Sequence, residues 1–133
     1  MRNIKDRIYE ALSSITVQEG GRELRPEVSD AYPTQWGEAS SIQITEEQNS
    51  VYERAGNVET KSMIRYRIDI WDRRSTSKMA LAVDNAVSAL GFVRTSCSDV
   101  PDPSAMKHKQ LRYEGIIEIS PVSSDRDVVY WDI

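Results

Sequence analysis

The strongest pattern of apolar and polar positions lies at 60–72, where strict alternation predicts a long β-strand. Every second residue from 64 to 70 is isoleucine or tyrosine and falls on one face, whereas Arg65, Arg67 and Asp69 fall on the other. One apolar and one charged face are typical of a central antiparallel strand that is covered on one side only.

Shorter patterns predict the rest of the fold. Alternation at 39–47, 92–96 and 109–119 indicates three further strands. Apolar residues recur at helical spacing over 3–15 and 76–90, each as a single stripe. We therefore expect an α+β fold in the order α-β-β-α-β-β. An antiparallel, or possibly mixed, sheet of about four strands would carry two α-helices on one face.

An acidic segment, residues 46–60, separates two of the predicted strands. It holds four glutamates against a single arginine, and Gly56-Asn57 is a turn signal. We expect a long, solvated and flexible hairpin loop here. The tail, 121–133, is polar and then apolar, which predicts either a last edge strand or an extended arm that docks on a neighbour.

Length and composition limit the possible classes of protein. The 133 residues suit one domain, spanning 1–133. The net charge of −4 argues against a general nucleic-acid binder, because such proteins displace counterions with a basic surface. The sequence lacks an apolar run long enough to cross a bilayer, and its first residues lack the pattern of a signal peptide, so we expect a protein made in a cytosol.

Catalytic and metal-binding patterns are not found, so we expect no enzyme activity, no cofactor and no metal. His108 is the only histidine, and its two lysine neighbours would discourage a further positive charge. It is interpreted as a loop histidine at a strand entrance. Cys97 with Asp99, Asp102 and His108 lacks the spacing of a credible ligand set. Cys97 is therefore expected to be a small buried residue at a strand end.

Aromatic residues at the ends of the predicted elements suggest an assembly surface. Trp36, Trp71 and Trp131 all lie at such ends, and tryptophan and tyrosine are enriched at interface hot spots. The alternative is that each packs under its own loop. Arg73 and Arg74 follow the long strand, where they could meet a partner's carboxylates or DNA phosphates, or simply form a solvated helix entrance.

Three stretches of the chain point to a family. They are an opening helix over 1–12, a strand ending in Trp71-Asp72 before an alanine-rich helix over 78–90, and a basic segment at 107–115 that runs into a strand. With the length and the order of elements, they resemble the tail-terminator and tail-completion proteins of long-tailed bacteriophages, which include head-to-tail joining proteins. The longer tail and the proline-rich loop 99–104 depart from the shortest members, so no role is carried over to them.

The resemblance implies a virion structural protein at the head-proximal end of the tail, assembled in the host cytoplasm. Its subunits, which could be monomers before assembly, would form a homo-oligomeric ring, usually a hexamer. The ring would cap the tail tube protein, dock onto the head connector or stopper protein, and let DNA pass without sequence-specific binding. Residues 46–60 would then line the channel or reach an adjacent ring. The expected interface or channel residues are Glu46, Glu47, Glu53, Glu59, Arg65, Arg67, Trp71, Arg73, Arg74, Tyr130 and Trp131.

Two alternatives remain open from the sequence. The first is another phage neck, head-completion or minor tail protein, although such proteins are commonly more helical than this pattern. The second is a small non-catalytic ligand-binding α+β module, which would need a pocket with a few convergent polar groups.

Overall fold

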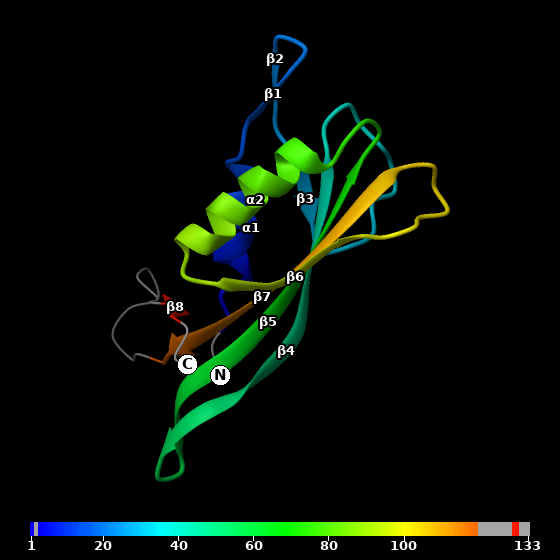
Figure 1. The fold of residues 1–133 in the computed structure, drawn as a ribbon. Coiled ribbons are helices and arrows are strands. Elements are labelled where there is room, and N and C mark those ends of the chain that lie inside the picture. Colours follow the sequence, from blue (N-terminus) through cyan, green and yellow to red (C-terminus); the bar gives the residue numbers. More distant parts are fainter. Residues whose placement is uncertain (2, 120–128, 131–133) are drawn as a thin grey trace.

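The computed structural model of the protein describes residue 1, residues 3–119 and residues 129–130 (Figure 1). It is an α+β fold with two helices. The helices are α1 (Lys5–Ser13) and α2 (Ser77–Ala89), and the strands are β1 (Val17–Glu19), β2 (Arg22–Leu24), β3 (Glu27–Ser29), β4 (Ser41–Ala55), β5 (Val58–Asp72), β6 (Val93–Asp99), β7 (Lys107–Glu118) and β8 (Val129–Tyr130).

The main sheet is mixed and has β5 at its centre. Within the described residues its order is β3-β4-β5-β7-β6, and β8 pairs with β7 beyond the point where β6 leaves it. The short strand β3 runs parallel to β4, whereas the other neighbours are antiparallel. β1 and β2 form a separate hairpin, turned by Gly20 and Gly21 at φ values of 59° and 79°, which glycine adopts without steric cost.

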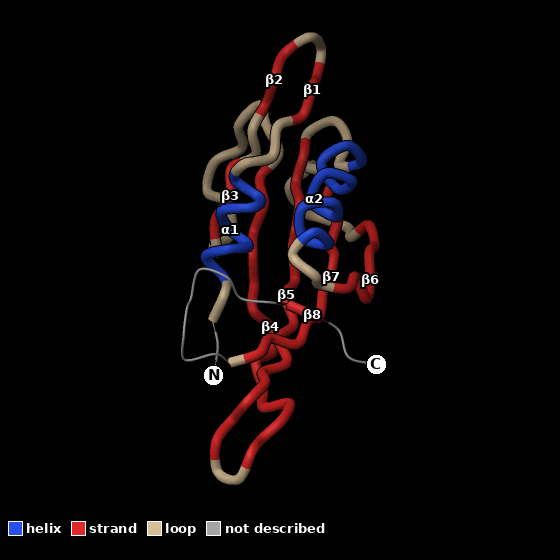
Figure 2. Tube along the Cα trace, turned by 90° about the vertical axis from the view of Figure 1, so that its left-hand side faces the viewer, coloured by secondary structure: helices blue, strands red, loops and turns tan. Residues whose placement is uncertain are grey.

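Both helices lie on the same face of the sheet and close one hydrophobic core (Figure 2). Ile8 and Leu12 of α1 are fully buried, as are Val83 and Val87 of α2. Burying side chains of this size stabilises a fold by roughly 1.5–3 kcal/mol each. The sheet contributes Ile42, Ile44, Ile64, Tyr66, Ile68, Ile70, Leu111, Tyr113 and Ile117.

Two of these core residues are tyrosines whose hydroxyl groups donate to carboxylates. Tyr66 donates to Glu46 Oε1 at 3.3 Å, and Tyr113 donates to Asp84 Oδ1 of α2 at 2.9 Å. Burial, with the nearby negative charges, raises the pKa of each phenol well above its ordinary value. Asp84 also pairs with Arg94 Nη1 at 3.2 Å, so it ties α2 to both β6 and β7.

The structure confirms both predicted helices and the long strand, but it corrects the acidic segment. The prediction of an irregular loop at 46–60 is wrong, because β4 and β5 continue through it to a two-residue turn at Gly56-Asn57. Register shifts within β4 and β5 hid the alternation that would have revealed the strands. The sequence also missed the short strands β1, β2 and β3 and the full length of β6.

The far end of this hairpin projects past the helices as a two-stranded ribbon (Figures 1 and 2). All residues at 51–58 are exposed, including Val51 at 44% and Val58 at 66%. We call residues 51–58 the ribbon tip.

Candidate functional site

The sheet face opposite the helices carries ion pairs across three strands. Arg65 and Glu114 lie opposite one another on β5 and β7, with Nη2 and Oε1 2.8 Å apart. Arg67 lies opposite Arg112, a like-charge pair that Glu47 bridges, with its carboxylate 3.5 Å from Arg67 Nη1 and 2.9 Å from Arg112 Nε. The charges of this face largely neutralise one another.

Glu47 lies on this face at a bulge in β4. The register moves from Glu46 opposite Tyr66 to Gln48 opposite Arg65, which leaves Glu47 as the extra residue. Glu46 instead accepts the hydrogen bond of Tyr66 on the core side. The two adjacent carboxylates therefore serve opposite faces, as the alternation of a strand requires.

The same face continues to a buried carboxylate, Asp69, which is only 2% exposed. Its Oδ2 accepts from Arg67 Nε at 3.0 Å, and its Oδ1 lies 2.8 Å from His108 Nε2 and 3.0 Å from Gln110 Nε2. Burying a charge is costly unless it is paired and hydrogen-bonded, and these contacts meet that condition.

His108 connects this carboxylate to a second one. Its Nδ1 lies 3.4 Å from Asp102 Oδ2, and the imidazole side chain is only 10% exposed. Asp102 belongs to the loop 100–106 between β6 and β7 and also accepts from Ser104 and from Trp71 Nε1, the latter at 2.8 Å. These hydrogen bonds, those of Ser104 foremost, lower the pKa of Asp102 below its ordinary value.

His108 lies at a strand entrance, as expected, but within the strand and not in the loop before it. It is the second residue of β7, and its ring lies between two carboxylates. Successive side chains of a strand point to opposite faces, so the flanking lysines lie on the other side. The sequence signal for the cluster was the shared face of Asp69 and Trp71, but His108 and Asp102 join it only through strand register.

Trp71 is also corrected, because it is buried rather than exposed. Only 2% of it is accessible. Its ring stacks on His108 with centroids 4.5 Å apart and planes 19° apart, and Tyr32 and Trp36 pack on it at 5.3 Å and 5.9 Å. Of the two readings offered for the tryptophans, packing under a loop of the same chain is the one that holds for Trp71.

The other residues expected at an interface are scattered over the molecule. Glu53, at the ribbon tip, is 51% exposed and pairs with Lys61, whereas Glu59 pairs with the amino group of Met1. Tyr130 lies in β8, and Trp131 lies outside the described residues. Cys97, expected to be buried, is exposed on β6.

Arg73 and Arg74 bind the backbone of the loop before β4 rather than extending freely into solvent. Arg73 donates to the carbonyl oxygen of Trp36 at 3.0 Å and Arg74 to that of Glu38 at 3.4 Å.

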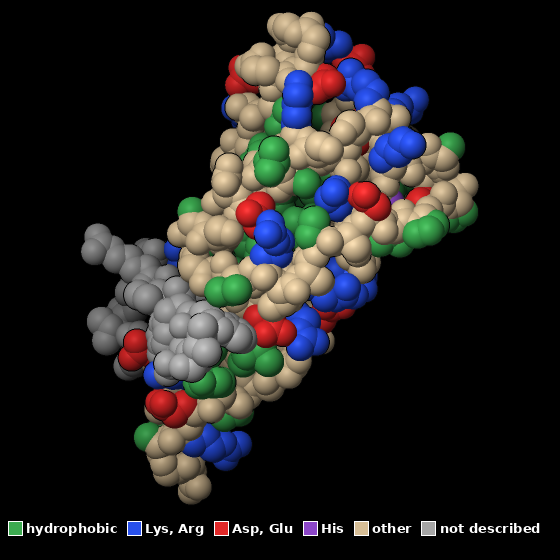
Figure 3. Space-filling view, in the orientation of Figure 1, with side chains coloured by type: hydrophobic (Ala, Val, Ile, Leu, Met, Phe, Trp, Pro, Cys, Tyr) green, Lys and Arg blue, Asp and Glu red, His purple; other side chains and the backbone are tan. Residues whose placement is uncertain are grey.

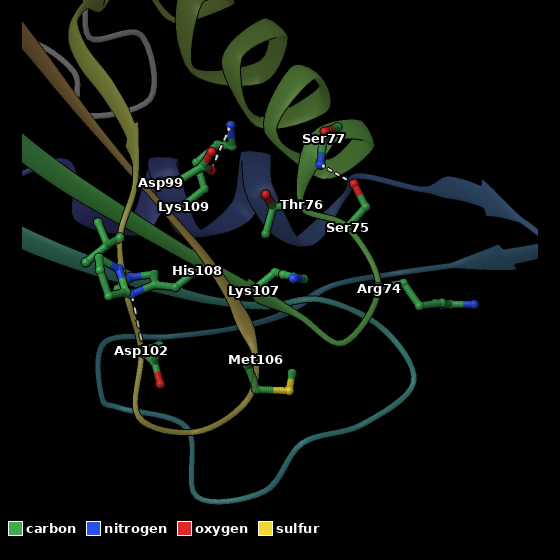
Figure 4. A pocket seen from close by; sticks show the side chains of 12 residues that line it. Arg74, Ser75, Thr76, Ser77, Asp99, Asp102, Met106, Lys107, His108 and Lys109 are labelled. Atoms are coloured by element: carbon green, nitrogen blue, oxygen red, sulfur yellow. Dashed lines mark hydrogen bonds and ion pairs between the residues drawn. The ribbon is translucent and has the colours of Figure 1, made fainter.

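Arg74 also lines a hollow of about 480 Å³ (Figure 4). One wall of the hollow is the loop 100–106 with Asp102, and the other is the start of α2 with residues 75–77. Its rim is polar, and the described residues contain no group of three side chains suited to a metal ion.

The side of the molecule that bears the helices shows acidic and basic side chains interspersed, without a broad patch of either sign (Figure 3). Among the described residues, neither helix has the length and apolar character needed to cross a membrane.

No known protein family matches the chain. No curated protein matches it either.

Proposed function

We propose that this chain is a virion structural protein of a long-tailed phage. Copies of it would form a ring, most simply a hexamer, that caps the head-proximal end of the tail tube and joins it to the head connector or stopper protein. The observation that carries this proposal is the ribbon, because it extends a stable sheet into solvent where nothing in the described chain covers it.

The composition of the ribbon tip supports a contact with a neighbour. A two-stranded ribbon is marginally stable in water unless a third strand or another surface packs on it. Val51 and Val58 nevertheless expose apolar side chains there. If a neighbouring subunit or the tube covered these two side chains, the burial of their apolar surface would stabilise the contact.

A second feature supports a ring rather than a two-fold pair. The strand β6 lies at the edge of the sheet, and all seven of its residues are exposed. The ribbon tip and this edge are different surfaces, and a closed ring requires a heterologous contact between two different patches.

Electrostatics are compatible with DNA passing through such a ring. The net charge is −4, and the arginines of the sheet face are bound to carboxylates of the same chain. Those arginines are therefore already neutralised, so DNA would meet little attraction at this face. We propose no sequence-specific contact.

Electron microscopy of the purified protein mixed with isolated tail tubes tests the function. We expect a ring at one end of each tube. The variant Val58→Ser should reduce the capped fraction, because it removes the most exposed apolar side chain of the ribbon tip. Leu81→Ser, at a 69% exposed position on α2, is the matched control and should cap normally.

Two outcomes would count against this assignment. Bare tube ends with a folded wild-type protein would contradict the capping role. Equal loss in both variants would show that the ribbon tip has no special part. Stabilisation of the protein by small molecules in a thermal-shift screen, with no binding to tubes, would instead support the ligand-binding alternative.

A further inference from the structure

One continuous row of charges runs across the sheet face and ends at the loop 100–106. It passes from Arg112 to Glu47, Arg67 and Asp69, each within 3.5 Å of the next. It then reaches His108 and Asp102. Two arginines therefore face three carboxylates, and one negative charge is left over. An imidazolium at His108 brings the row to neutrality and makes its signs alternate from end to end.

The two protonation states of His108 treat the two carboxylates differently. The contact of Nε2 with Asp69 Oδ1, at 2.8 Å, is the shorter, so a neutral imidazole keeps its single proton there. Its Nδ1 lone pair then faces the Asp102 carboxylate at 3.4 Å, and that contact is not attractive. The imidazolium carries a proton on both nitrogens, so it keeps the hydrogen bond to Asp69 and attracts Asp102 as an ion pair across 3.4 Å.

Among the groups around His108, Asp102 is the one whose contact with the ring depends on the protonation state of the imidazole. Trp71 stacks on the ring in either state. Asp69 keeps Arg67 and Gln110 as donors in either state. On the neighbouring elements, Lys109 of β7 is occupied by Asp99 of β6 at 3.2 Å, and the cations of Arg74 and Lys107 lie on the hollow.

We propose that the charge on His108 controls how firmly the loop 100–106 is held against the end of the sheet. With a protonated imidazole the loop is held closed through Asp102. With a neutral one the loop is released and the hollow that it walls widens. The hold is present while the imidazole carries two protons, and it is lost when a rise in pH removes one of them. This device does not depend on the function proposed above.

The chain is well suited to a direct test because it contains one histidine. NMR of the His108 ring carbons follows its protonation without ambiguity. The indole N–H of Trp71, which donates to Asp102 at 2.8 Å, reports the position of the loop. Amide hydrogen exchange of residues 100–106 is measured in parallel and corrected with an unstructured peptide of the same sequence.

We expect exchange in the loop to quicken by about tenfold as His108 loses its proton, with the same midpoint as the ring signals. Asp102→Asn should abolish this pH dependence, because the amide can still accept from Trp71 but carries no charge. Asp99→Asn is the control, since it removes a carboxylate of the same hollow that binds Lys109 instead, and it should behave like the wild type.

Titration of His108 with no change in loop exchange or in the Trp71 signal would overturn the proposal. Retention of the full pH dependence by Asp102→Asn would do the same. If that variant does not fold, the wild-type comparison of the two midpoints decides alone.

Discussion

The hydrogen bond between Tyr113 and Asp84 predicts an unusual order of stability among three variants. Tyr113 is fully buried, and its hydroxyl donates to Asp84 Oδ1 at 2.9 Å. The side chain of Asp84 is 28% exposed and also contacts Arg94. Removing one partner therefore leaves the other in a different environment: Asp84 retains a cation and water, whereas Tyr113 would keep a buried hydroxyl without an acceptor.

The magnitudes follow from that difference. Tyr113→Phe removes one hydrogen bond to a partly solvated carboxylate and should cost about 1–2 kcal/mol. Asp84→Ala leaves the hydroxyl unsatisfied and also removes the Arg94 pair, so it should cost about 2–4 kcal/mol. In the double variant no buried hydroxyl is left without an acceptor. Adding Tyr113→Phe to Asp84→Ala should therefore restore about 1 kcal/mol.

Urea denaturation at neutral pH measures these differences, with the slope checked for constancy. Asn85→Ala, at the exposed neighbouring position of α2, corrects for the higher helix propensity of alanine. If the double variant is less stable than Asp84→Ala alone, the reasoning about a stranded hydroxyl is wrong.

Three further predictions concern pH and backbone geometry. Because the pKa values of Tyr66 and Tyr113 are raised in the folded protein, the unfolded chain releases these protons first, and stability should fall as the pH rises above about 10. Urea melts across that range should show a smaller fall of stability with pH in Tyr113→Phe than in the wild type. An equal fall in both proteins would contradict the raised pKa of Tyr113. Asp102 has a lowered pKa in the folded protein, so its contribution to stability is present at neutral pH and is lost as the pH falls below about 4. The stability of Asp102→Asn should therefore fall less steeply with acid than that of the wild type. Gly56 has φ of 66° with open space around its Cα, so Gly56→Ala should cost about 1 kcal/mol through backbone strain alone. Gly37→Ala, where an added Cβ makes only an ordinary 3.6 Å contact, should cost little in urea melts of the two variants, and equal losses would refute this account.

Local periodicity predicted the parts of the fold that depend on a single segment. The stripes of α1 and α2 and the alternation of β5, with its charged face, come from the residue order alone. The three-residue strands β1, β2 and β3 have too few positions to show a period. In the ribbon, bulges after Glu46 and Val51 shift apolar residues between faces, so a regular hairpin resembled an irregular acidic loop.

The cluster around His108 could not be predicted in the same way. Asp69 and His108 are 39 residues apart, and Trp71 and Asp102 are 31 apart. Their meeting depends on the register in which Trp71 pairs with His108 and on the path of the loop 100–106. The lysines beside His108 in the sequence suggested repulsion, whereas the strand turns them away and the pairing supplies two carboxylates.

The ribbon and the His108 cluster lie at opposite ends of β5, and this has a mechanical consequence. From Lys61 to Asp72 the strand pairs with β7 without any shift of register. The base of the ribbon is less regular, because the pairing of β4 with β5 shifts register between Val51 and Glu53 and again between Glu53 and Arg54. A neighbour that displaced the tip would therefore bend the ribbon at these shifts, and the evenly paired part of β5 would shield the stacked rings at its other end from that movement.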